Sequence, residues 1–220
     1  MKTRSLWAAM LVVLALSIFD SAKGEMRSVP QVQLLILSDQ SNSVADSGWR
    51  DKQRDAWQAI FRSFRPYCMT MYVDFISWGS SVERSFSSVI SPSYNDPIVM
   101  DTLIRRHWQE SHGNLWLTSP HVVISGLDTY IRRDMDRVLV IFSTDDQARD
   151  SADLGLKRQV DQSLDFVGVA LGKEGHVEWY LKTQVIPAGG EYLQVNDTTE
   201  LERSLWQVLR RTDRASCPLG

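Results

Sequence analysis

The sequence predicts an α/β fold built on a mainly parallel sheet. Strand-like and helix-like segments alternate along the chain, as in proteins assembled from strand–helix–strand units. The segment over residues 138–142 is apolar without interruption, which is typical of a central strand covered on both faces. Two β-rich runs are joined by Gly79-Ser80-Ser81, a combination that favours a tight hairpin. A hairpin makes one strand antiparallel, and we expect that strand at an edge of the sheet.

The other elements follow from hydrophobic spacing and from capping residues. The first strand is predicted over residues 32–37, and the helix after it is capped by Asp46 or Ser47 and closed by Pro66. The last helix is expected to begin with a capping box formed by Thr199 and Glu202. The remaining predictions are helices starting at residues 95–96 and 120, a helix over 151–164, a strand over 165–171, a helix around 176–186 and a strand over 191–195.

The first 24 residues have the pattern of a cleaved secretory signal. Lys2 and Arg4 precede an apolar run over residues 6–19, and the small residues Ala22 and Gly24 follow it. The run is about 14 residues long, shorter than the roughly 20 needed to span a bilayer, although an uncleaved anchor is the alternative. We therefore expect a secreted or periplasmic protein with no membrane span after cleavage. Residues 30–212 form one domain in this prediction, and residues 213–220 form a C-terminal tail.

Charge and cysteine content restrict the classes of partner. Removing residues 1–24 takes away three basic residues and one acidic residue, which changes the net charge from −3 to −5. Without a basic block, the sequence gives no indication of nucleic-acid binding. Cys68 and Cys217 are the only cysteines, and an oxidising compartment favours a disulfide between them. The alternative is that Cys68 is a small core residue and Cys217 a thiol in the tail.

Polar clusters follow two of the predicted central strands. Asp39 comes directly after the first strand with Ser41 and Ser43 at alternate positions, and Asp145 lies in the cluster after residues 138–142. Ligands of open α/β sheets bind beyond the carboxyl ends of strands where the strand order reverses. If the two strands are neighbours at that reversal, Asp39 and Asp145 converge, and Thr118 caps a helix whose start could point there. This oxygen-only set suits Mg²⁺ or Mn²⁺, whereas the alternative reading makes these residues turn and capping residues.

These residues resemble a known metal site. Asp39-x-Ser41-x-Ser43 after an apolar strand, the later Thr118, and Asp145 in "VLVIFSTDD" look like the metal-ion-dependent adhesion site (MIDAS) of von Willebrand factor A (vWA) domains. The resemblance implies a doubly wound, three-layer α/β/α fold, Rossmann-like, with about six strands and one antiparallel edge strand. It also implies that the hydroxyls of Ser41, Ser43 and Thr118 ligate the cation directly or nearly so, while Asp39 and Asp145 often act through water.

A closer resemblance covers nearly the whole chain after the signal. It is to a family of secreted bacterial proteins with a vWA-like domain of unknown function, and it rests on the segments "MYVDFISWG", "ISGLDTYI", "DRVLVIFSTDD", "EWYLKTQVIPAGGEYLQV" and "LERSLWQVLRR". The sequence departs from the MIDAS pattern in the loop before the threonine, where Leu115-Trp116-Leu117 replaces the usual glycines. An alignment without a gap places the threonine position at Val122, so Thr118 or Ser119 serves only with a four-residue difference in the loop. Asp146 also replaces the usual glycine after the second aspartate.

The function predicted from these features is a secreted, non-enzymatic module that binds a protein partner through a divalent cation, with a partner carboxylate completing the coordination. One alternative is a metal-dependent hydrolase or phosphatase with Asp39 as nucleophile, although Ser41 stands where a second acid is expected. The other is a structural scaffold with an unoccupied site. Trp78 and Trp116 are candidate exposed anchors of a binding surface, with partial burial under loops as the competing reading.

Overall fold

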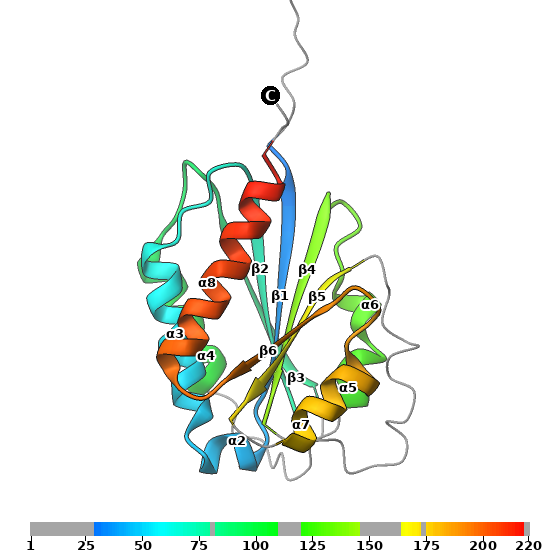
Figure 1. The fold of residues 1–220 in the computed structure, drawn as a ribbon. Helices are drawn as coiled ribbons and strands as arrows, with labels where there is room; N and C mark the ends of the chain where they lie inside the picture. The colour runs from blue at the N-terminus through cyan, green and yellow to red at the C-terminus, as the bar shows by residue number, and fades with distance from the viewer. Residues whose placement is uncertain (1–28, 80–81, 110–119, 146–163, 173–174, 218–220) are drawn as a thin grey trace, which may run out of the picture.

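The computed structural model describes residues 29–79, 82–109, 120–145, 164–172 and 175–217 (Figure 1). These residues form a sheet with the strand order β3-β2-β1-β4-β5-β6. The strands are β1 (Gln31–Asp39), β2 (Thr70–Trp78), β3 (Val82–Ile90), β4 (Arg137–Thr144), β5 (Asp165–Leu171) and β6 (Glu191–Val195). Neighbouring strands are parallel except β3, which pairs antiparallel with β2 at the edge. The predicted fold class and the antiparallel edge strand are confirmed.

Helices cover both faces of the sheet and divide the core into two layers (Figure 1). The helices α3 (Trp49–Ser63), α4 (Pro97–Gln109) and α8 (Thr198–Ala215) pack their apolar sides on one face. The short helices α5 (Pro120–Ile124), α6 (Leu127–Tyr130) and α7 (Gly175–Tyr180) pack on the other, and α7 continues as a π-helical turn over Leu181–Val185. Because both faces are covered, β1 is buried almost throughout. No helix in the described ranges has the length and apolar character needed to cross a bilayer.

Two helix starts differ from the sequence prediction. The helix expected from Asp46 or Ser47 is divided into α2 (Asn42–Asp46) and α3, because Gly48 between them adopts a left-handed conformation with φ of 75°. The helix α8 begins earlier than expected: Asp197 accepts a hydrogen bond from the backbone N–H of Glu200, whose carboxylate accepts one from the N–H of Asn196. Asp197 and Glu200 have the same spacing as Thr199 and Glu202, so the sequence pattern alone could not distinguish the two possible capping pairs. The helix predicted over 151–164 lies outside the described residues.

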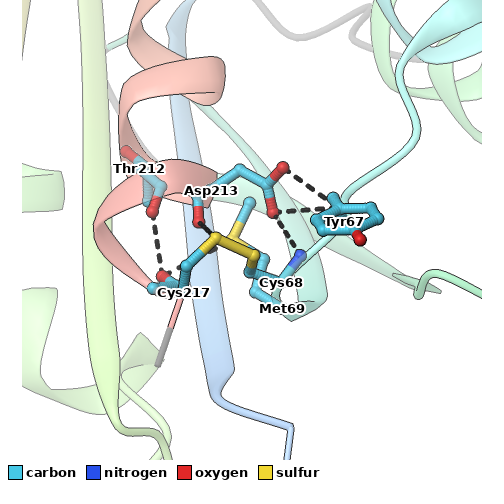
Figure 2. Close-up of a disulfide and its surroundings, with 7 residues drawn as sticks. Tyr67, Cys68, Met69, Thr212, Asp213 and Cys217 are labelled. Atoms are coloured by element: carbon cyan, nitrogen blue, oxygen red, sulfur yellow. Dashed lines mark hydrogen bonds between the residues drawn. A yellow bond between two sulfur atoms is a disulfide. The ribbon is translucent and has the colours of Figure 1, made fainter. Parts of the chain in front are cut away.

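A disulfide fastens the end of α8 to the start of β2 (Figure 2). Cys68 and Cys217 are bonded with their Cα atoms 4.8 Å apart, which confirms the predicted pairing. The buried carboxylate of Asp213 strengthens this junction by accepting hydrogen bonds from the backbone N–H groups of Tyr67, at 3.0 Å, and Cys68, at 2.9 Å. The bond closes a loop of 149 residues, for which chain-entropy arguments give about 5 kcal/mol of stabilisation. The helix continues to Ala215, beyond the domain end expected at residue 212.

Trp78 is part of the core and forms no exposed anchor. Its side chain is fully buried and stacks on Phe142 with ring centroids 4.8 Å apart. The idea that Trp78 is exposed beside the hairpin is therefore wrong: the residue is the last of β2, and its side chain points into the helix-covered layer rather than out of the turn. Trp116 lies outside the described residues.

Candidate functional site

The reversal of strand order lies between β1 and β4. From β1 the chain adds β2 and β3 on one side, and from β4 it adds β5 and β6 on the other. The two strands are parallel neighbours with Ser38 paired to Ser143, so their polar ends leave the sheet side by side. This confirms the expectation that the two strands are neighbours at the reversal. Such a position is where ligands of open α/β sheets bind.

Asp39 is the buried centre of the cluster. Its side chain is fully inaccessible to solvent. One carboxylate oxygen accepts a hydrogen bond from the backbone N–H of Ser41 at 2.8 Å, and the other accepts one from the Thr144 hydroxyl at 2.6 Å. Burial raises the pKa of Asp39 to about 7; the hydrogen bonds from Thr144 and Ser41 oppose this shift, and the nearby charge of Asp145 adds to it. The carboxylate therefore occupies a position where a positive charge would stabilise its ionised form.

A chain of hydrogen bonds connects Asp39 to Asp145 through Ser41 and Ser43. The Ser41 and Ser43 hydroxyl oxygens are 3.1 Å apart, and Ser43 donates a hydrogen bond of 2.8 Å to Asp145. Ser47 donates to the second oxygen of Asp145 at 3.1 Å. The alternate spacing of Ser41 and Ser43 has a local cause, because Ser41 caps α2 and Ser43 lies in its first turn. The tight turn brings both hydroxyls to the same side.

The structure thus brings together four of the five residues predicted for the site: Asp39, Ser41, Ser43 and Asp145. Thr118 lies outside the described residues, so its position relative to the others stays a prediction. Sequence reasoning did not assign two participants, Thr144 and Ser47. Thr144 precedes Asp145 in the same polar cluster, and Ser47 follows Ser43 by one helical turn, a spacing that places side chains on one face.

The donor set fits a hard divalent cation. Two carboxylates and the hydroxyls of Ser41 and Ser43 offer only oxygen, which is the ligand chemistry of Mg²⁺ and Mn²⁺. Within the described ranges no group of three or more His, Cys, Asp or Glu side chains is placed to hold a metal. A cation at this site therefore depends on the hydroxyls as well as the two acids.

Comparisons with known proteins identify the fold. The sequence matches no protein-family model and no curated protein. Among solved structures, the ArnB paralogue VWA2 from Sulfolobus acidocaldarius is similar with a TM-score of 0.56 at 14% identity, over 82% of this chain and 45% of VWA2. BatB from Bacteroides thetaiotaomicron is similar with a TM-score of 0.55 at 12% identity, over 84% of this chain and 99% of BatB.

A third similar structure contains an occupied metal site. It is proximal thread matrix protein 1 from the mussel byssus, with a zinc-occupied MIDAS motif; the TM-score is 0.58 at 10% identity, over 84% of this chain and 46% of the mussel protein. The chain spans less than half the length of VWA2 and of the mussel protein. The shared architecture shows that this chain has a vWA-like α/β fold, as the sequence predicted.

Proposed function

We propose that this protein is an exported binding module that uses a divalent cation to recognise a carboxylate of a protein partner. The cation binds at the MIDAS-like cluster, which is formed by Asp39, Ser41, Ser43 and Asp145 with Thr118. One observation carries the proposal: Asp39 and Asp145 are 106 positions apart in the sequence but meet at the switch point of the sheet. Asp39 accepts from the Ser41 N–H, Asp145 accepts from the Ser43 hydroxyl, and the two serine hydroxyls are 3.1 Å apart. The vWA-like fold and the zinc-occupied MIDAS motif of one similar protein support it.

In this proposal each residue has a separate task. The Ser41 and Ser43 hydroxyl oxygens hold the cation, with Thr118 as the third hydroxyl. Asp39 fixes the backbone of Ser41 through the 2.8 Å hydrogen bond, and Asp145 orients the Ser43 hydroxyl. The bound cation supplies positive charge that offsets the two carboxylates and attracts a carboxylate of the partner.

Binding is favoured over phosphoryl transfer by the environment of Asp39. Both of its carboxylate oxygens already accept hydrogen bonds, and the side chain has no solvent exposure. A nucleophilic carboxylate needs an oxygen that can reach the substrate. Turnover of a generic phosphoester that is lost in Asp39→Asn would reverse this preference.

Calorimetric titration of the protein with Mg²⁺, Mn²⁺ and Zn²⁺ tests the cation site. We expect at least one of these ions to bind and to raise the melting temperature, and Asp39→Ala and Asp145→Asn to abolish both effects. Asp128→Asn is the matched control, since Asp128 is an exposed acid of α6 outside the cluster. A protein without any cation response, or a response that survives Asp39→Ala, contradicts the proposal.

The partner and the location are tested separately. Pull-down from the native host extract with and without a chelator should recover a partner only when the cation is present. N-terminal sequencing of the protein from an extracytoplasmic fraction should start at residue 25. The Cys68–Cys217 disulfide supports an oxidising compartment.

A further inference from the structure

The large hydrophobic side chains that remain exposed are gathered at one end of the molecule. Seven such side chains are exposed in the described ranges, and Trp179 of α7 is the one that lies elsewhere. The other six belong to the amino ends of the parallel strands, the end of β3 and the start of α4: Val29, Tyr67, Val89, Tyr94, Ile98 and Val99. Tyr67 is 83% exposed and Ile98 is 77% exposed. Clustered exposure of this kind marks an interaction surface.

Hydrogen bonds hold the segments of this end together. The Pro30 carbonyl accepts a hydrogen bond from the Thr70 N–H, which places Val29 beside the start of β2. The Asn95 side chain donates to the Phe64 carbonyl at 3.0 Å, so the loop that carries Tyr94 rests on the end of α3. Figure 1 shows the first described residues and the end of α8 at this end of the sheet, with α2 at the opposite end. The helix α2 contains Ser43, so the MIDAS-like cluster lies at that opposite end.

Two arginines lie around Phe64 at the same end. The Arg210 guanidinium lies over the Phe64 and Trp206 rings, 5.5 Å and 4.8 Å from their centroids. Arg65 donates to the Phe64 carbonyl at 2.8 Å. In the part of the chain that the structure describes, neither arginine forms an ion pair with an acid. Stacking fixes the Arg210 group in place while leaving its charge available.

Three acids of this region have hydrogen-bond or ion-pair partners, and Glu202 of α8 lies near Ser63 and Trp206. Asp101 is shared by Arg62 and Arg105, at 3.1 Å and 2.9 Å. Asp213 is buried and accepts from the Tyr67 and Cys68 N–H groups, while an oxygen of the capping residue Asp96 accepts from two N–H groups of α4. On the described surface between α3, α4 and α8, the arginines outnumber the acids by five to four, although the net charge of the whole chain is negative. The arginines are Arg62, Arg65, Arg105, Arg210 and Arg214, and the acids are Asp96, Asp101, Asp213 and Glu202.

We infer that this surface, the basic aromatic edge formed by Arg65, Arg210, Tyr67, Tyr94 and Ile98, docks on an anionic lipid bilayer. Exposed tyrosines and aliphatic residues at loop tips, flanked by arginines, match the chemistry of the membrane interface and of anionic headgroups. Docking in this orientation directs the MIDAS-like cluster away from the bilayer, and the inference does not depend on that cluster binding a cation.

Vesicle sedimentation with the protein that begins at residue 25 tests the inference, because this form lacks the apolar run over residues 6–19. Vesicles of phosphatidylcholine are compared with vesicles that also contain about 30 mol% phosphatidylglycerol, because the anionic lipid supplies the attraction to arginine. We expect tighter binding to the anionic vesicles, weakened by high salt and unchanged by a chelator. Equal binding to both vesicle types, or binding to anionic vesicles that high salt does not weaken, overturns the inference.

Paired variants locate the docking surface. Arg65→Gln with Arg210→Gln should lower partition onto anionic vesicles by roughly 10- to 30-fold, and Tyr67→Ser with Tyr94→Ser should also weaken it. The matched control, Lys52→Gln with Arg203→Gln, removes two positive charges from the early turns of α3 and α8, and neither residue forms an ion pair among the described residues; Trp179→Ser controls for loss of an exposed aromatic. Circular dichroism verifies that each variant is folded. Equal loss in the control pair, or binding of an acidic protein without any vesicle binding, overturns the inference.

Discussion

Asp39 and Asp74 are buried carboxylates on neighbouring strands, but they have different partners. Asp74 of β2 accepts two hydrogen bonds from the Arg132 guanidinium, at 2.9 Å and 3.2 Å, and one from the Gln33 side chain at 2.7 Å. Asp39 of β1 accepts from a hydroxyl and a backbone N–H, and no basic side chain among the described residues contacts it. The charge of Asp74 is offset within the fold. That of Asp39 is not, which makes it the candidate for an external cation.

The largest expected effect concerns a third buried ionisable group. His107 of α4 lies against Phe75 and Trp108, and burial lowers its pKa to about 3 from an ordinary value of 6.5. Between these values the unfolded chain binds the proton and the folded protein does not, so stability is complete above pH 6.5 and falls as the pH drops toward 3. The free energy of unfolding should lose about 5 kcal/mol from this group by pH 3.

Denaturant titration over this pH range measures the effect. His107→Leu should remove this part of the pH dependence, and His176→Gln should retain it, because His176 is an exposed residue of α7. Identical pH dependence in His107→Leu and the wild type would show that burial does not keep His107 neutral. In that case, the effect of burial on the pKa of Asp39 would need its own measurement.

Removing the Asp74 carboxylate is expected to have the next largest effect. Asp74→Ala leaves the Arg132 guanidinium without its carboxylate and removes one of the two acceptors of the Gln33 amide, so the free energy of unfolding should fall by about 3 kcal/mol. Urea denaturation at neutral pH measures the change. The control is Asp55→Ala, which removes an exposed partner of Arg54 and should change stability by less than about 1 kcal/mol.

Asp39→Asn should change stability in the opposite direction. The amide keeps an acceptor for the Ser41 N–H and removes a buried charge without a basic partner, so the cation-free variant should be more stable than the wild type by roughly 2 kcal/mol at about pH 8. The same denaturation experiment applies. A loss comparable to that of Asp74→Ala would mean that Asp39 has a structural role like that of Asp74.

The smallest expected effect separates two similar serine pairs. Ser41 and Ser43 have hydroxyl oxygens 3.1 Å apart beside Asp145, and Ser91 and Ser93 have oxygens 3.3 Å apart at the opposite end of the sheet. Ser43→Ala should weaken cation binding about tenfold, or about 1.4 kcal/mol, whereas Ser93→Ala should leave it unchanged. Isothermal titration measures both. Equal affinities in the two variants would remove Ser43 from the set of ligands.

Much of the fold could be predicted because local patterns encode it. The apolar run of β4, the hairpin at Gly79 and the Cys68–Cys217 pair each gave a correct prediction. Local patterns were insufficient at the start of α8, where two nearby residue pairs could both cap the helix. Asp197 with Glu200 and Thr199 with Glu202 have the same three-residue spacing, and the structure shows the capping hydrogen bond at the first pair.

The candidate site likewise combines features that the sequence predicts with features that only the tertiary structure decides. The sequence by itself determined which residues carry the chemistry, because Asp39, Ser41, Ser43 and Asp145 follow apolar strands and offer only oxygen donors. The tertiary structure decided that these residues meet, since the pairing of β1 with β4 brings two distant strand ends together and α2 turns the hydroxyls to one side. It also decided that Asp39 has no basic partner while Asp74 has Arg132, because charge compensation depends on which side chains pack together in space.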